Sequence, residues 1–267
     1  MHKDKQRLDV RLTEEGFTTS REKARAAIMA GQVFVEGVRV DKPGFMVARN
    51  ASLEVRGNPI PYVSRGGLKL EKALKVFGLD INNRVVLDVG ASTGGFTDCA
   101  LQNGAKLVYA VDVGYGQLDW RLRNDPRVVV LERSNIRYLK KEQVPVTPDF
   151  ITIDVSFISL TKVLENISEL TDPAAIGVAL VKPQFEAGRD KVGKRGVVRE
   201  PEVQLEVLQN ITNFIKKMGW SVRGVDYSPV TGPEGNIEFL VYFDKSGQQS
   251  KDIDLQEVVK QAHDELA

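Results

Sequence analysis

The spacing of apolar residues divides the chain into a short N-terminal segment and a longer α/β segment. Between residues 1 and 56 the pattern predicts helices at 7–15 and 21–30, then a hairpin over 33–40 and a strand at 53–55. From about residue 67 onward, short apolar runs alternate with helical patterns. Several runs are apolar at every position, which is typical of strands buried on both faces of a sheet. The sequence therefore predicts a doubly wound, Rossmann-like α/β domain behind a small α+β module.

Turn-forming residues separate the two predicted domains. The stretch 57–66 is rich in glycine and proline, as linkers are. We therefore predict an N-terminal domain at 1–58, a linker at 59–66 and a larger domain at 67–267. The strands predicted for the larger domain lie at 85–89, 107–111, 128–131, 150–153, 176–181, 220–225 and 239–243, and the clearest helical patterns lie at 160–170 and 202–218.

Composition excludes several classes of protein and of site. The 267 residues are 42% hydrophobic and 27% charged, which are ordinary globular values. A single cysteine, Cys99, excludes an internal disulfide framework and the common cysteine-rich zinc sites. His2 and His263, the two histidines, lie near the termini, so a catalytic site built on histidine is not expected. No apolar run could span a bilayer and the start is polar, so we expect a cytoplasmic protein without a membrane partner or a bound metal.

Positive charge is concentrated in the N-terminal domain. The whole chain is nearly balanced, with 37 Lys and Arg against 36 Asp and Glu, whereas residues 1–56 hold 11 basic and 8 acidic residues. Such a cluster is typical of a surface that binds a phosphate backbone, and a solvated helix face is the alternative. The basic residues on or beside the two predicted helices are Arg7, Arg11, Arg21, Lys23 and Arg25.

A glycine-rich loop, residues 87–96, follows the first strand of the larger domain and opens a helix. Asp112 ends the next strand, where a carboxylate can bind ribose hydroxyls. A dinucleotide loop reads Gly-x-Gly-x-x-Gly and holds a pyrophosphate, but here Ser92 takes the second glycine position. Asp88, just before Gly90, would repel a pyrophosphate and suits a cationic cofactor. A glycine-containing strand–helix turn without a ligand is the alternative.

This loop, together with Asp112, resembles the S-adenosylmethionine loop of class I methyltransferases. The resemblance implies S-adenosylmethionine as the cofactor. The residues that it implies for cofactor binding are Asp88, Gly90, Ser92, Gly94, Gly95, Phe96, Asp112, Asn135 and Asp154.

The sequence lacks residues that two kinds of methyl transfer to a base require. Methyl transfer to C5 of a pyrimidine needs a cysteine nucleophile, and Cys99 is better interpreted as a packing residue of the helix after the loop. Methyl transfer to a base nitrogen usually uses an Asn/Asp-Pro-Pro-aromatic sequence, where this chain has Asp154-Val155-Ser156-Phe157, without prolines. Both base-directed reactions are therefore disfavoured.

Four charged residues at element ends, Lys69, Asp154, Lys182 and Glu238, resemble the tetrad of FtsJ-type ribose 2′-O-methyltransferases. A ribose hydroxyl is a poor nucleophile and must lose its proton as it attacks. The resemblance implies that Lys182 is the general base and that Lys69 assists it and contacts the ribose or phosphate. It implies that Asp154 orients Lys182 and that Glu238 positions a lysine.

The N-terminal domain resembles the S4 RNA-binding domain over residues 6–56. Its matching residues are Arg7-Leu8-Asp9, Gly16, Ser20-Arg21, Ala24, Ile28, Gly31-Gln32-Val33, Val38-Arg39-Val40 and Lys42-Pro43. The pattern departs mildly at the hairpin turn, where asparagine is common near Glu36. The resemblance implies two helices and a small sheet that bind structured RNA.

Taken over residues 6–243, the chain is similar to the TlyA/haemolysin A family, on the sequences at 64–70, 154–160, 181–186 and 235–238. The similarity implies a bacterial enzyme that methylates cytidine riboses of ribosomal RNA, within free rRNA or ribosomal subunits. Beyond the N-terminal cluster, the residues expected to contact RNA are Arg65, Arg189, Lys191, Lys194 and Arg195, the last four in a loop for which a solvated surface is the alternative.

Two other functions compete with this interpretation. One is an O-methyltransferase of small molecules, in which the N-terminal domain serves another purpose. The other is an RNA-binding or membrane-lytic protein with a vestigial methyltransferase fold. The complete tetrad argues against the second, because a binding module has no need for two lysines that converge on one crevice.

Overall fold

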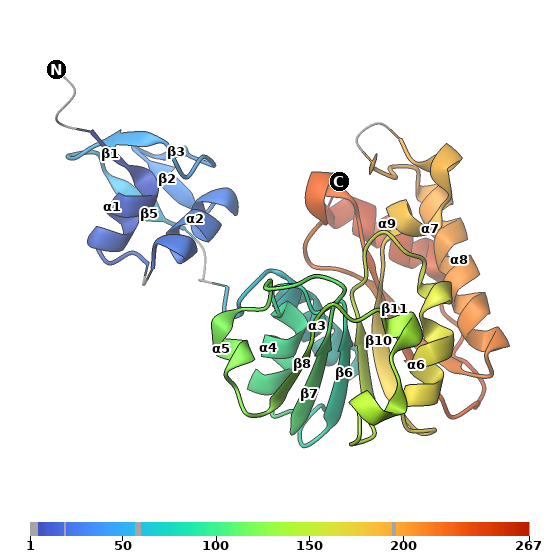
Figure 1. Ribbon diagram of the computed structural model, residues 1–267. Helices are drawn as coiled ribbons and strands as arrows, with labels where there is room; N and C mark the ends of the chain where they lie inside the picture. The colour runs from blue at the N-terminus through green and yellow to red at the C-terminus, as the bar shows by residue number, and fades with distance from the viewer. Residues whose placement is uncertain (1–4, 19, 57–59, 194–195, 267) are drawn as a thin grey trace. The chain divides into compact units, whose positions relative to one another are not determined.

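The computed structural model describes residues 5–18, 20–56, 60–193 and 196–266. The chain divides into two compact units, residues 1–61 and 62–267 (Figure 1). The division falls inside the stretch that the sequence predicts as a linker, and each unit is described by itself.

The N-terminal unit packs two helices against short strands. The helices are α1 (Leu8–Glu14) and α2 (Arg21–Met29); β1 (Lys5–Arg7) pairs with β4 (Met46–Ala48), and β2 (Val33–Val35) lies between β3 (Val38–Arg39) and β5 (Leu53–Val55). The Ser20 hydroxyl caps α2 by accepting from Lys23 N. The core consists of Leu8, Leu12, Ala24, Ile28, Val33 and Val47. The predicted α+β module is confirmed. The sequence did not predict β1 and β4, which have three residues each and are too short to show an alternating pattern.

The larger unit is built on a seven-stranded sheet in the order β11-β12-β10-β9-β6-β7-β8. The strands are β6 (Val85–Val89), β7 (Leu107–Val111), β8 (Val128–Leu131), β9 (Phe150–Ile153), β10 (Ile176–Val181), β11 (Ser221–Tyr227) and β12 (Phe239–Asp244). Strands β6 to β10 are mutually parallel, while β12 runs antiparallel between β10 and β11. The predicted doubly wound α/β sheet is confirmed, with one reversed strand.

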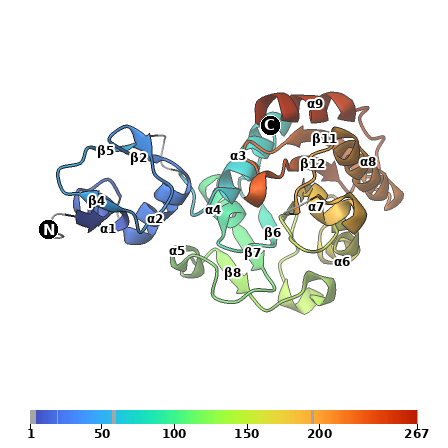
Figure 2. The same cartoon turned by 90° about the horizontal axis from the view of Figure 1, so that it is seen from above.

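Helices cover both faces of this sheet (Figures 1 and 2). One layer holds α3 (Gly66–Phe77), α4 (Gly95–Gln102) and α5 (Trp120–Arg123), and the other holds α6 (Leu164–Leu170), α8 (Pro201–Lys217) and α9 (Leu255–Leu266). Alternate residues of a strand enter opposite layers, so Val86 packs in the first and Leu87 in the second. Shorter helices are α7 (Pro183–Glu186) and the 3₁₀ turns η1 (Ile136–Tyr138), η2 (Lys141–Gln143), η3 (Leu160–Lys162), η4 (Arg189–Lys191) and η6 (Pro233–Gly235). The helix predicted over 160–170 is therefore divided into η3 and α6.

The glycine-rich loop connects β6 to α4 where two backbones approach closely. Gly90 has a φ of +86°, and a Cβ there would lie 2.4 Å from the carbonyl oxygen of Asp154. A Cβ at Gly95 would lie 2.3 Å from Ser64 Oγ and 2.8 Å from Gly67 N. Glycine is thus required for the contact between the ends of β6 and β9 and for the contact between the starts of α3 and α4.

A buried carboxylate organises the helices of the N-terminal unit. The Asp9 side chain is fully buried and accepts hydrogen bonds from Arg7 Nε at 3.0 Å and Arg21 Nε at 3.0 Å. The Arg7 guanidinium, with that of Arg21, lowers the pKa of Asp9 from 3.8 to about 2. A buried carboxylate without such partners would strongly destabilise the unit.

We predict that Asp9→Asn destabilises α1 and α2 at neutral pH and much less in acid. Because the Asp9 pKa falls from 3.8 to about 2 on folding, the stabilisation is complete above about pH 4 and is lost as the pH falls through 2. With screening of the half-exposed arginines, the variant should lose about 1–2 kcal/mol at pH 7. Hydrogen exchange of the α1 and α2 amides, compared with wild type at each pH, measures this. Asp125→Asn, which removes an Asp–Arg pair of the other unit, is the control; a difference that stays constant with pH would contradict the assignment.

We predict that Gly90→Ala destabilises the larger unit more than Gly104→Ala. Both residues have a similar positive φ, +86° and +88°, and share its strain of about 1–2 kcal/mol. At Gly104 the new methyl group meets the exposed Asn82 side chain, whereas at Gly90 it meets the Asp154 backbone. The Gly90 variant should therefore lose about 1–3 kcal/mol more, the cost of overpacking. Urea unfolding followed by tryptophan fluorescence measures both, and equal losses would disprove the role of the backbone contact.

Candidate functional site

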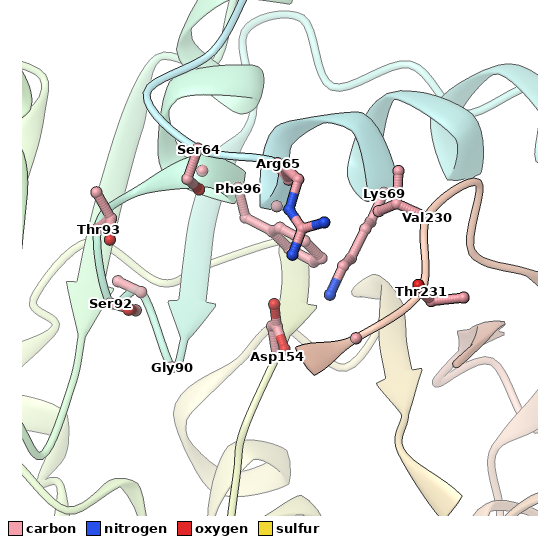
Figure 3. Close-up of a pocket in the computed structure, with 14 residues that line it drawn as sticks. Ser64, Arg65, Lys69, Gly90, Ser92, Thr93, Phe96, Asp154, Val230 and Thr231 are labelled. Carbon is pink, nitrogen blue, oxygen red and sulfur yellow. The ribbon is translucent and has the colours of Figure 1, made fainter. Parts of the chain in front are cut away.

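A cavity of about 260 Å³ opens at the carboxyl ends of β6 and β9 (Figure 3). The glycine-rich loop forms one wall, the start of α3 a second and residues 230–232 a third. Crevices at this edge of an open α/β sheet are the usual ligand sites of such folds. In Figure 3 the side chains of Arg65 and Lys69 extend from the start of α3 toward Asp154.

Five of the nine predicted cofactor residues reach this cavity. The residues of that set that line it are Gly90, Ser92, Gly95, Phe96 and Asp154. Those that the cavity lining does not include are Asp88, Gly94, Asp112 and Asn135. Of the second group, Gly94 belongs to the loop, and Asp112 contacts the loop at Ser92 N.

Asp88 lies beneath the loop, fully buried in β6. Its carboxylate accepts hydrogen bonds from Thr97 Oγ1 on α4 at 2.6 Å and from Thr152 Oγ1 on β9 at 2.9 Å. Burial raises the Asp88 pKa to about 6, against the effect of these hydrogen bonds. The carboxylate thus joins three elements whose ends form the cavity.

Asp112 holds the loop from the side of β7. Its carboxylate accepts hydrogen bonds from Ser92 N at 2.7 Å and Gly114 N at 2.6 Å, and Ser92 itself has a φ of +49°. Each carboxylate oxygen retains a lone pair for a further donor. Asn135, after β8, caps η1 by accepting from Arg137 N at 3.1 Å.

The four charged residues of the predicted tetrad form two buried ion pairs. Lys182 Nζ lies 2.6 Å from Asp154 Oδ1, and Lys69 Nζ lies 2.6 Å from Glu238 Oε2. The four side chains are between 1% and 18% exposed. Pairing is what makes four buried charges tolerable in one place.

Sheet topology explains why these residues meet. Asp154 follows β9 and Lys182 follows β10, and these strands are parallel neighbours. Glu238 precedes β12, which is antiparallel to β10 and pairs Phe239 with Val181. A residue before β12 and a residue after β10 therefore lie at the same edge of the sheet.

The sequence analysis did not predict that Ser156 contacts Lys182. Lys182 Nζ donates to Ser156 Oγ at 2.9 Å, so the amine lies between a carboxylate and a hydroxyl. The position of Ser156, two residues beyond Asp154 in a strand-end loop, is the signal that could have indicated it.

The structure corrects one predicted RNA contact. Arg11 is 6% exposed, and its guanidinium donates to the carbonyl oxygens of Ala48 and Ala51 and to Glu15. The Arg11 side chain therefore holds the N-terminal unit together and is not available to RNA. The sequence prediction was wrong because the spacing of apolar residues cannot distinguish an arginine that points inward from one that points outward. The other four residues of the cluster, Arg7, Arg21, Lys23 and Arg25, are exposed or half-exposed.

Of the remaining predicted RNA contacts, one lines the cavity. Arg65 lines the cavity and is exposed. Arg189 is exposed, and Lys191 forms an ion pair with Glu206 on α8 at 2.6 Å. Lys194 and Arg195 lie outside the described residues.

Exposed aromatic residues near this edge were also missed. Phe157 is 90% exposed, has a φ of +63° and lies 4.9 Å from the Phe185 ring. Tyr115 and Tyr138 are also largely exposed. The Arg133 guanidinium lies over the Tyr115 ring, and the Arg137 guanidinium lies over the Tyr138 ring. Basic and aromatic residues interleaved between 115 and 138 were the available signal.

Across the part of the chain that the structure describes, no helix is both long and apolar enough to cross a bilayer. Within the same residues no group of His, Cys, Asp and Glu side chains is arranged to hold a metal ion.

Comparison with known proteins identifies both units. The family model of FtsJ-like methyltransferases matches residues 62–245, and that of the S4 domain matches residues 6–53. Hemolysin A of Brachyspira hyodysenteriae is 45% identical over 89% of this chain and 99% of that protein. The 16S/23S rRNA (cytidine-2′-O)-methyltransferase TlyA of Mycobacterium tuberculosis is 43% identical over 88% of each chain.

A solved structure is similar to this chain over nearly its whole length. The Streptococcus thermophilus protein, which carries the hemolysin name, is 48% identical with a TM-score of 0.79 and covers 98% of this chain and 97% of its own. The resemblance stated from the sequence is thus confirmed, and the chain belongs to the TlyA/haemolysin A family of FtsJ-like methyltransferases that carry an S4 domain.

Proposed function

We propose that this protein transfers a methyl group from S-adenosylmethionine to the 2′-hydroxyl of a cytidine in ribosomal RNA. The observation that carries the proposal is the pair of buried lysine–carboxylate contacts, Lys182–Asp154 and Lys69–Glu238, beside the glycine-rich loop. The same reaction is named for the TlyA relative of Mycobacterium tuberculosis.

The cavity suits the proposed cofactor. Glycine at positions 90 and 95 keeps the loop free of side chains, so that a ligand could lie against its backbone. Asp112 lies outside the lining but contacts Ser92 N of the loop, and with a free lone pair on each oxygen it would hold the cofactor's ribose. Asp154 supplies negative charge to the lining itself. When bound, S-adenosylmethionine supplies an electrophilic methyl group on a sulfonium cation, which the Asp154 carboxylate of the lining would attract.

Lys182 is the proposed general base. As the ribose oxygen bonds to the methyl carbon, the carbon–sulfur bond breaks and the hydroxyl proton passes to Lys182 Nζ, which must have lost its own proton beforehand. Asp154 and Ser156 hold this amine in a fixed orientation. Lys69, fixed by Glu238, supplies a positive charge for the ribose or its phosphate. Much of the rate should come from holding the reactants in attack geometry.

Exposed cations support RNA, rather than a small molecule, as the substrate. The S4 domain keeps Arg7, Arg21, Lys23 and Arg25 at its surface, and Arg65 stands at the cavity itself. An exposed aromatic side chain such as Phe157 offers a surface on which a base can stack. A ribosomal substrate implies a cytoplasmic location.

The direct test is tritium transfer from labelled S-adenosylmethionine to ribosomal subunits and to naked rRNA. Alkaline hydrolysis then locates the label, because a 2′-O-methyl group makes the adjoining phosphodiester resistant. We expect label in alkali-resistant dinucleotides that begin with cytidine. Label on bases, or on small molecules alone, would overturn the proposal.

We predict that Lys182→Ala lowers single-turnover methyl transfer by at least about 10²–10⁴-fold, the contribution of a general base. Lys182→Arg should be equally impaired, since a guanidinium stays protonated at any working pH. Calorimetry should find S-adenosylmethionine affinity nearly unchanged in both. Lys72→Ala is the matched control. Lys72, on α3, also forms an ion pair, with Asp226, but neither residue lines the cavity. Near-normal transfer by Lys182→Arg would mean that Lys182 acts through its charge alone.

We predict that the double change Lys23→Ala, Arg25→Ala weakens rRNA binding and flattens its dependence on salt. These two residues are chosen because Arg7 and Arg21 also stabilise the buried Asp9. Each lost phosphate contact should reduce the log–log slope by up to about 0.9, the duplex value. Filter binding across a salt series measures the slope.

The charge-matched control is Lys216→Ala, Lys217→Ala, at the end of α8. This end of α8 leads into β11 at the edge of the sheet opposite the cavity. The control should leave the slope unchanged, and S-adenosylmethionine affinity should be unchanged in both variants. Equal slopes for both double variants would exclude the N-terminal helix α2 as an RNA contact.

A further inference from the structure

The segment that follows the predicted RNA loop is unusually buried for a loop. Val197 and Val198 are 6% and 1% exposed, and they come directly after the stretch that carries Arg189 and Lys191. Backbone groups buried outside regular structure must find partners elsewhere. Here side-chain amides supply them.

Asn236 provides the first pair of contacts. Its side chain is 2% exposed; Oδ1 accepts from Val198 N at 3.1 Å and Nδ2 donates to Gly196 O at 3.0 Å. These backbone partners fix which amide atom is which, since an N–H only donates and a carbonyl only accepts. Asn236 stands two residues before Glu238 in the chain.

Gln204, on α8, provides the third contact. Its side chain is fully buried, and Nε2 donates to Val198 O at 3.0 Å. Its Oε1 therefore faces His263 Nε2 on α9, 3.0 Å away. Because Oε1 can only accept, the proton of this bond is carried by His263 Nε2.

The side-chain ion pair of the basic stretch with α8 is weaker than these contacts. Lys191 pairs with Glu206, but these side chains are 36% and 51% exposed. Exposed ion pairs contribute little to stability. The buried amide contacts hold Gly196 and Val198, and Gly193 N donates to Val197 O at 3.0 Å, which ties the basic stretch to this buried segment.

We propose that Asn236, Gln204 and His263 form an amide clamp that positions the basic stretch 189–193 for the RNA substrate, fixed to the segment that carries Glu238. The clamp joins the wall of the proposed active site to α9, an element that begins after the FtsJ-like match ends at residue 245. All three are positioning residues for the RNA and take no part in methyl transfer. The assignment of RNA as the ligand rests on the proposed function above.

The clamp itself is tested by trypsin cleavage of the full-length protein after Arg189 and Lys191. Asn236→Ala and Gln204→Leu each leave a buried backbone group of 196–198 without its partner. Cleavage at these sites should accelerate about tenfold, which corresponds to about 1.4 kcal/mol of local opening. Thr212→Val is the control, because it removes another buried hydrogen bond of α8 that does not touch the segment. Wild-type cleavage rates in both clamp variants would overturn the proposal.

His263 is tested by a pair of variants. His263→Ala should accelerate cleavage, though less than Asn236→Ala, because the imidazole is half-exposed and water can replace it. His263→Gln keeps an N–H near the position of Nε2 and should restore resistance. If His263→Gln does not restore resistance to trypsin, α9 is not part of the clamp.

The role in substrate positioning is tested by methyl-transfer kinetics with ribosomal subunits. We expect KM for the RNA substrate to rise about tenfold in Asn236→Ala and Gln204→Leu, with kcat and S-adenosylmethionine affinity nearly unchanged. Faster cleavage with an unchanged KM would show a clamp of purely structural importance and overturn the positioning role. If wild-type protein methylates no rRNA, the proposed function fails instead, whatever the trypsin result.

Discussion

A lysine or carboxylate removed from water loses several kcal/mol of hydration free energy, so buried charges must be paired. Four such groups, Lys69, Asp154, Lys182 and Glu238, are buried together at one edge of the central sheet. Each lysine contacts one carboxylate at 2.6 Å, so the cluster is neutral as a whole. This constraint fixes both amines in place, as the proposed reaction at a ribose hydroxyl requires.

The reversed strand β12 satisfies that constraint. Parallel strands alone deliver residues that follow them to the carboxyl edge, as β9 and β10 do for Asp154 and Lys182. Because β12 is antiparallel, it delivers a residue that precedes it, Glu238, to the same edge. Gly90 allows the ends of β6 and β9 to approach closely, so the glycine-rich loop lies beside the charged cluster. The glycine-rich loop, proposed to bind the cofactor, and the proposed base are thus neighbours through sheet geometry.

In the N-terminal unit, charged residues serve the fold as well as the surface. Asp9, buried and ionised, holds Arg7 and Arg21 while leaving part of each guanidinium in solvent. Arg11 lies inward instead, where it satisfies backbone carbonyls of the loop at 48–51. The same short stretch of sequence therefore supplies both the charged residues at the surface and those that stabilise the unit. The direction in which each side chain points decides which of the two roles it has.

The sequence by itself determined the fold class and the glycine-rich loop, because strand periodicity and strand-end positions are local properties. The four clustered charges were identified from the sequence by their resemblance to the tetrad of FtsJ-type methyltransferases. The resemblance already implied that Asp154 orients Lys182, but only the tertiary structure decided that Glu238 pairs with Lys69 and that Ser156 contacts Lys182. It also decided that Arg11 is buried and that Asn236 and Gln204 bind the same backbone segment. These contacts join residues far apart in the chain, and no local pattern carries them: they follow from strand order, from the reversal of β12 and from the direction of individual side chains.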